Sequence, residues 1–70
     1  MYFATNLRYL RRQNGYSQQD IARILGYSSF TTIQKWESGV STPPLNKYIR
    51  LAEIFSVDMD DFARKDLTAE

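Results

Sequence analysis

Short segments with helical periodicity, separated by tight turns, are the feature that most constrains how this chain can fold. Apolar residues recur three and four positions apart, as on one face of a helix, and no alternating pattern typical of strands is present. Asn14-Gly15, Gly26 and Ser38-Gly39 are signals that end helices. The predicted helices span residues 3–14, 17–25, 30–37, 44–55 and 59–64. Because helices this short are marginal in water on their own, they must pack together in an all-α domain.

The length of the chain allows one domain. It has 70 residues, and domains of roughly 60 to 70 residues are close to the lower limit for folding alone. We predict a single domain over residues 1–66. Residues 65–70 carry no periodic pattern and are expected to fray, so that 67–70 form a tail or the start of a linker.

The composition removes most enzyme chemistry. The chain has no Cys and no His, which excludes disulfides, thiol nucleophiles, imidazole bases and the common nitrogen and sulfur metal ligands. Asp58, Asp60 and Asp61 are close in sequence but lack EF-hand spacing, and Asp58 is placed to cap the last helix. We therefore expect no enzyme, no metal site, no cofactor and no small-molecule substrate.

No apolar run approaches the roughly 18 to 20 residues that cross a bilayer. The first 12 residues also lack the apolar stretch of a signal peptide. These two features predict a cytoplasmic protein without a membrane partner.

Charge is divided unevenly along the chain. Residues 1–50 carry seven basic and two acidic residues, whereas residues 51–70 carry two basic and six acidic residues. The basic part is compatible with a surface that meets a polyphosphate, but ordinary solvated helix faces would give the same division. Charge alone therefore leaves the function open.

Local signals also define the second and third helices. Ser17 with Asp20 three residues later is a variant of the capping box, followed by the apolar residues Ile21, Ala22, Ile24 and Leu25. The third helix has only Ile33 and Trp36 as large apolar anchors. Its remaining surface is polar, which is typical of a helix that packs weakly inside and contacts something outside.

The whole motif order resembles the Cro and phage-repressor helix-turn-helix family, also called the xenobiotic-response-element-like family. The motifs are L-R-x-x-x-G-x-S-Q at 10–18, I-A-x-x-L-G at 21–26, I-x-x-W-E-x-G at 33–39, P-x-L at 43–45 and L-A-x-x-F-x-V-x-x-x-D-F at 51–62. The resemblance covers about residues 6–63 and implies a compact five-helix, lambda-repressor-like DNA-binding domain. One residue more than the usual spacing separates Gly26 from Ile33, so we expect a longer turn with Ser29 as the cap of the third helix.

The resemblance implies that the third helix reads base edges in the major groove. Amide, ammonium and methyl groups are suited to purine edges and thymine methyl groups. The residues expected at base edges are Phe30, Thr31, Gln34 and Lys35. Phe30 has an alternative, which is packing against Tyr27 to brace the longer turn, and Trp36 is expected in the core.

The family also implies contacts to the DNA backbone from the start of the second helix and from the loop after the third. The residues expected at phosphates are Ser17, Gln18, Ser29, Thr32, Ser38, Ser41, Thr42 and Lys47. Thr32 has an alternative place at the boundary between the second and third helices. The resemblance further implies an ion pair between Arg11 and Glu37, which would hold the third helix against the first.

These features predict a transcriptional regulator of the phage-repressor type that binds double-stranded DNA. Because such domains read few base pairs each, we expect a homodimer on a palindromic operator. The alternative is a protein-interaction module, such as an antitoxin-like or regulatory partner that keeps the fold. Basic residues on the side of the third helix favour DNA.

Overall fold

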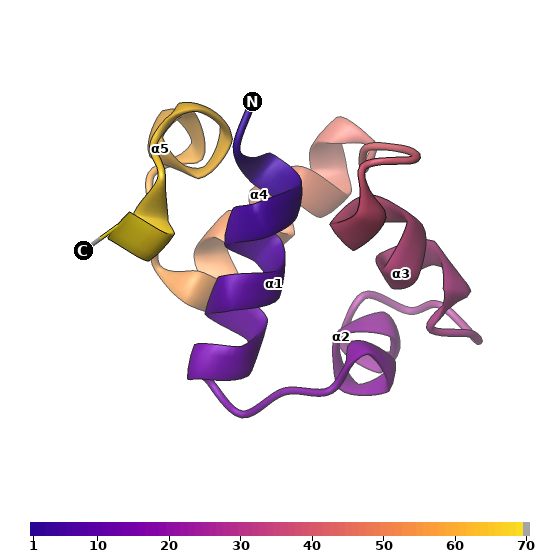
Figure 1. The fold of residues 1–70 in the computed structure, drawn as a ribbon. Coiled ribbons are helices and arrows are strands. Elements are labelled where there is room, and N and C mark those ends of the chain that lie inside the picture. The colour runs from indigo at the N-terminus through magenta and orange to yellow at the C-terminus, as the bar shows by residue number, and fades with distance from the viewer. Residues whose placement is uncertain (70) are drawn as a thin grey trace.

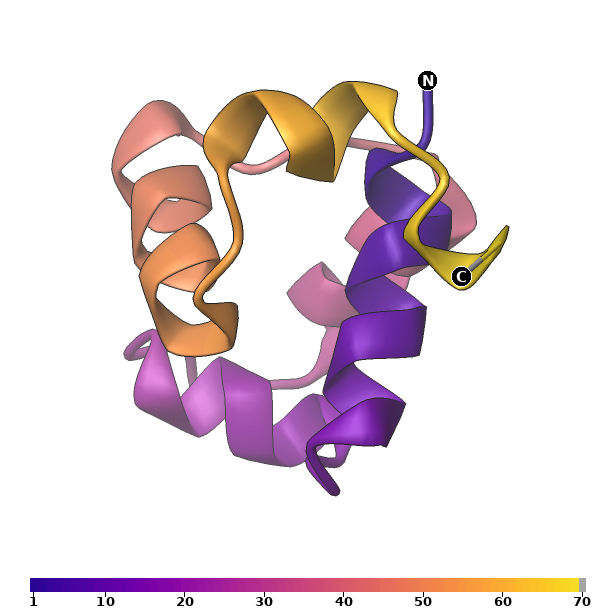
Figure 2. The same ribbon diagram turned by 90° about the vertical axis from the view of Figure 1, so that its left-hand side faces the viewer.

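The computed structural model describes residues 1–69, and these contain helices and no strand. The order is α1 (Phe3–Gln13), α2 (Gln18–Ile24), α3 (Thr31–Ser38), α4 (Leu45–Phe55), α5 (Met59–Arg64) and a terminal 3₁₀ turn η1 (Leu67–Ala69). In Figure 1, α1 lies between α5 on one side and α2 with α3 on the other. Figure 2 shows α1, α2, α4 and α5 arranged around a common interior. The predicted all-α, five-helix fold is confirmed.

Each helix contributes one large apolar side chain that is completely buried in this interior. These residues, each 0% exposed, are Leu7, Ile21, Ile33, Leu51 and Phe62. Burying one such side chain stabilises the folded state by about 1.5 to 3 kcal/mol relative to leaving it in water. A helix removed from this arrangement would expose its anchor, so the five helices stabilise one another.

Aromatic rings join the first helix to the last two. The Phe3 ring lies 4.8 Å from that of Phe62 and 5.3 Å from that of Tyr48, the second pair edge-on. Phe55 also meets Phe62 edge-on at 6.4 Å. The Tyr48 hydroxyl donates a hydrogen bond to the carbonyl of Met59, and this links α4 to α5.

The predicted caps of α2 and α5 are confirmed. The Ser17 hydroxyl accepts from the Asp20 N–H at 2.9 Å, and the Asp20 carboxylate accepts from the Ser17 N–H at 2.9 Å. Asp58 accepts from the N–H groups of Asp60 and Asp61 at 2.8 and 3.1 Å. Both caps involve residues within three positions of each other, which is why the sequence predicts them.

The start of the third helix differs from the expectation by one residue. Its cap is Phe30, which makes no capping side-chain hydrogen bond, and not Ser29. The Ser29 hydroxyl instead accepts from the N–H of Thr31 at 3.2 Å, as in a serine turn. The additional residue is thus absorbed before the helix begins. Tyr27 packs edge-on against Trp36 at 5.8 Å, and no ring contact joins Tyr27 to Phe30 in residues 1–69.

Three large apolar residues of α2 and α4 are exposed. Ile24 is 40% exposed, Leu45 66% and Ile49 39%. Periodicity identifies the apolar side of a helix, but only the centre of that side meets the core in a domain this small. These residues lie at its edges.

The end of the chain also differs from the expectation. Asn6 is 0% exposed, and its amide donates to the carbonyls of Phe62 at 2.9 Å and Lys65 at 2.7 Å. Its carbonyl oxygen accepts from the N–H of Leu67 at 3.0 Å. Residues 67–69 are therefore folded against α1 as η1 and are not frayed, because a buried amide on the first helix binds their backbone. Glu70 lies outside the described residues.

Candidate nucleic-acid interface

Helix α3 has one buried and one exposed face. Ile33, Trp36 and Glu37 are buried, at 0%, 2% and 6% exposure. The exposed residues are Thr31, Gln34, Lys35 and Ser38, and Thr32 is half-buried. The prediction that Trp36 belongs to the core is confirmed. The polar face is therefore available to a ligand, while two apolar anchors fix the helix from behind.

The end of α3 is closed by a glycine whose backbone most residues avoid. Gly39 has φ 81°, in the left-handed region that favours glycine. The N–H of Val40 then donates to the Lys35 carbonyl at 3.0 Å. This closure directs the following loop away from the helix axis, and it leaves Ser41 and Thr42 exposed.

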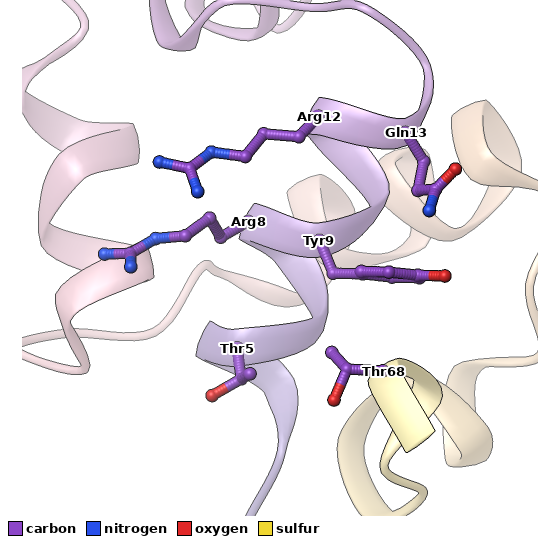
Figure 3. Close-up of a pocket in the computed structure, with 6 residues that line it drawn as sticks. All are labelled: Thr5, Arg8, Tyr9, Arg12, Gln13 and Thr68. Carbon is purple, nitrogen blue, oxygen red and sulfur yellow. The ribbon is translucent and has the colours of Figure 1, made fainter. Parts of the chain in front are cut away.

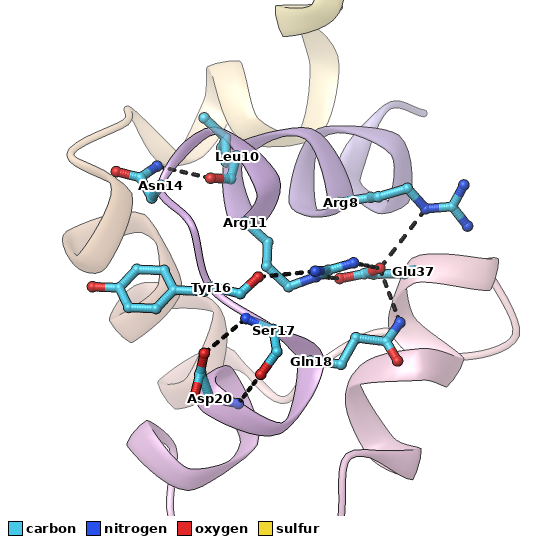
Figure 4. A network of polar contacts seen from close by, with 9 residues as sticks. All are labelled: Arg8, Leu10, Arg11, Asn14, Tyr16, Ser17, Gln18, Asp20 and Glu37. Carbon is cyan, nitrogen blue, oxygen red and sulfur yellow. Dashed lines mark hydrogen bonds and ion pairs between the residues drawn. The ribbon is translucent and has the colours of Figure 1, made fainter.

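Glu37 forms the ion pair with Arg11 that the resemblance implied (Figure 4). Arg11 Nε donates to Glu37 Oε2 at 2.6 Å, and Arg11 Nη2 donates to Oε1 at 3.0 Å. Arg11 Nη1 donates to the carbonyl of Tyr16 at 2.9 Å. The hydrogen bond with Glu37 raises the pKa of Arg11 above its usual value, against the effect of burial. The pair therefore fixes α3 to α1 and also orients the turn that leads into α2.

Gln18, predicted at a phosphate, lies at the same carboxylate. Its Nε2 donates to Glu37 Oε1 at 3.1 Å, so α2 joins the network that links α1 and α3. Next to it, the hydrogen bonds from the N–H and hydroxyl of Ser17 lower the pKa of Asp20 below its usual value. The position of Gln18 at the start of α2 was predictable, whereas its contact with Glu37 was not.

Lys47 is engaged within the domain. Its ammonium donates to the carbonyl of Leu25 at 2.8 Å and lies 5.3 Å from the centroid of the Tyr27 ring. It therefore closes the carboxyl end of α2, where a cation is favourable. Ser38 makes a local contact, with its hydroxyl donating to the Lys35 carbonyl at 3.1 Å.

The sequence reasoning missed Arg8. Its Nε lies 3.8 Å from Glu37 Oε1, and its side chain is 52% exposed. Arg8 and Arg11 are three residues apart on α1, which places them on adjacent parts of one helix face. This spacing of three residues is the sequence feature that could have placed Arg8 near the Arg11 and Glu37 pair.

The acidic end of the chain is explained by helix contacts. Asp58 caps α5, and Asp60 pairs with Arg64 at 3.0 Å. The described residues hold no cluster of three or more acidic residues placed to bind a metal ion. None of the helices in residues 1–69 is long and apolar enough to cross a membrane.

Comparison with known proteins agrees with this geometry. The sequence model of the helix-turn-helix family matches residues 7–62, which is most of the chain. The chain therefore belongs to the helix-turn-helix family of the Cro and repressor type, and it is a DNA-binding domain. That family is one of DNA-binding and not of enzymatic domains. No curated protein and no solved structure matches the chain significantly.

Proposed function

We propose that this protein is a phage-type transcriptional repressor that reads a palindromic operator as a homodimer in the cytoplasm. The observation that carries the proposal is the division of α3, which buries Ile33, Trp36 and Glu37 and exposes Thr31, Gln34 and Lys35. A short helix held from behind in this way is suited to the major groove, where its outward side chains meet base edges.

Three exposed side chains of α3 have groups that suit base edges. The Lys35 ammonium can donate to guanine acceptors, and the Gln34 amide can pair with adenine. Thr31 offers a hydroxyl and a methyl group at the first helical position, although its hydroxyl shares a hydrogen bond with Ser29 at 2.9 Å. Each base contact of this kind discriminates by about 1 to 3 kcal/mol.

Phe30 is a further candidate for base contact. It is 44% exposed at the start of α3, and the Tyr27 ring packs edge-on against Trp36. An exposed ring next to a base-reading helix is suited to the methyl group of thymine.

The proposed phosphate contacts divide according to their internal bonds. The hydroxyl groups of Ser17 and Ser29 already accept hydrogen bonds from nearby backbone N–H groups. The Gln18 amide donates to Glu37, and the Lys47 ammonium donates to the Leu25 carbonyl. Each of these four residues would bind a phosphate through the hydrogen-bond donors that it has left. Less engaged candidates surround the end of α3, where Ser41 and Thr42 are exposed. Ser38 and Thr32 complete the proposed set.

The deciding experiment is selection of duplexes from a random DNA library with the purified 70-residue protein. Recovery of an inverted repeat, with half-sites about one helical turn apart, supports a dimeric operator reader. A single unrepeated motif contradicts the dimer but supports sequence-specific reading. A folded sample that enriches no motif contradicts the proposal and favours the protein-interaction alternative.

A further inference from the structure

An open groove along α1 is lined by polar and basic side chains together with the aromatic ring of Tyr9. Its residues come from α1 and η1, and they are Thr5, Arg8, Tyr9, Arg12, Gln13 and Thr68. Figure 3 shows that Arg8 and Arg12 extend to one side of α1, while Tyr9 and Gln13 extend to the side of η1. No carboxylate lines the groove, so its charge is positive.

The Arg8 side chain has one ion-pair partner within the described residues, and the contact is made by its Nε atom. Its Nε lies 3.8 Å from Glu37 Oε1, but that carboxylate already accepts hydrogen bonds from Arg11 and Gln18 at 2.6 to 3.1 Å. The remaining nitrogens of Arg8 make no hydrogen bond with the described residues, and its side chain is 52% exposed. Glu37 thus orients Arg8 beside α3 without neutralising it, since the carboxylate is shared with Arg11.

Arg12 lies one helical turn further along and is exposed. Within residues 1–69 it has no ion pair. Two guanidinium groups four residues apart therefore extend from one face of α1 on the side toward α3 (Figure 3). A guanidinium presents several donors in a fork that matches a phosphate group.

We propose that Arg8 and Arg12 bind backbone phosphates of the DNA strand that flanks the half-site read by α3. This inference rests on the proposed function, because it needs the exposed face of α3 in the major groove. The phosphate contacts expected from the sequence come from the start of α2, the turn before α3, α3 itself, the loop after α3, and α4. The groove adds phosphate contacts from α1. The protein would then contact DNA backbone beyond the base pairs that α3 reads.

The test is the salt dependence of binding to a duplex recovered by selection. The slope of log K against log salt concentration is negative, and each phosphate contact adds about 0.9 to its magnitude. Because the proposed homodimer carries each substitution twice, we expect Arg12→Gln to reduce the magnitude of the slope by about 1.8 and the Arg8→Gln/Arg12→Gln pair to reduce it by about 3.6. The corresponding Lys pair should restore most of the slope, because it keeps the charges. In phosphate ethylation interference, ethylation of the phosphates that flank the half-site should block binding of the wild type but not of the Gln pair.

The matched control is Arg64→Gln, which removes one positive charge from α5, on the opposite side of α1 from α3 (Figure 1). Its slope should equal that of the wild type. An unchanged slope in Arg12→Gln and in the Gln pair overturns the inference, and so does an equal drop in Arg64→Gln. Loss of binding to an acidic peptide with unchanged DNA binding also overturns it, in favour of a protein partner.

The two proposals fail separately. A wild-type protein that selects a motif but shows no effect of Arg8 and Arg12 refutes only the groove. A wild-type protein that binds no duplex refutes both. The Arg12 side chain makes no ion pair or hydrogen bond with residues 1–69, so the single variant keeps the test valid if the double variant folds poorly.

Discussion

Arg11 Nε lies 2.6 Å from Glu37 Oε2, and this ion pair joins the first helix to the end of the third. The carboxylate is nearly inaccessible, with 1% of the Glu37 side chain exposed. A buried pair adds little net stability compared with apolar residues, but breaking it leaves one charge uncompensated. Its main consequence is therefore positional, because it fixes the orientation of α3 relative to α1.

Glu37→Gln should be strongly destabilising. It leaves the Arg11 guanidinium buried without its counter-ion, and we expect a loss of about 3 to 5 kcal/mol in the free energy of unfolding, measured with urea. The control is Arg11→Met combined with Glu37→Leu, which removes both charges. If the pair acts as described, this double variant is more stable than Glu37→Gln. Equal stabilities would contradict the account.

Lys35→Ala should weaken operator binding while the fold stays intact, because Lys35 is exposed on α3. The expected loss is about 1 to 3 kcal/mol, with relaxed preference at one base position. Fluorescence anisotropy on duplexes with all four bases at each position separates the two proposed roles. Uniform weakening across all sequences would identify a phosphate contact instead of a base contact.

Phe30→Ala should remove a contact to a thymine methyl group. Replacing that thymine by uracil deletes one methyl group and should weaken the wild type by about 0.8 kcal/mol. The same replacement should have no effect on Phe30→Ala, since the ring is already absent. The two changes form a double-mutant cycle. If the losses in binding free energy from Phe30→Ala and from replacement by uracil are additive at every thymine, this contact is excluded.

Asn6→Ala should destabilise the end of the chain most. It removes the Asn6 hydrogen bonds to the carbonyls of Phe62 and Lys65 and to the N–H of Leu67. The bond to Phe62 is buried, and a buried group left unsatisfied costs about 1 to 3 kcal/mol. Hydrogen exchange at Leu67 should rise together with the loss of global stability. Thr5→Ala, on the exposed side of the same helix, is the control and should have little effect.

Alkaline pH should destabilise the domain in part through Tyr48. Burial, with smaller contributions from Asp60 and Asp58, raises the pKa of Tyr48 above its usual value near 10. The folded state then favours the neutral phenol. The resulting stability is present below the unfolded-state pKa and is lost as pH rises through the folded-state pKa. Unfolding followed by circular dichroism should show a smaller alkaline loss in Tyr48→Phe, and an equal loss would contradict this role.

Much of the architecture could be predicted because its signals are local. The capping box of Ser17 and Asp20 and the cap at Asp58 involve residues within three positions. Periodicity identified Ile33 and Trp36 as buried, and so it also identified the opposite side of α3 as exposed. The Arg11 and Glu37 pair was available only from the resemblance to a family, since the residues are 26 positions apart.

The sequence by itself therefore determined the number and order of the α-helices, the caps of α2 and α5, and the family. Tertiary structure alone decided that Asn6 binds Leu67 across 61 positions, that Lys47 closes α2 at Leu25, and that Gln18 meets Glu37. It also decided that α3 begins at Thr31 and that Arg8 and Arg12 line one groove with Thr68. Helix formation and capping depend on neighbours within about four residues, whereas these contacts depend on how the finished helices pack.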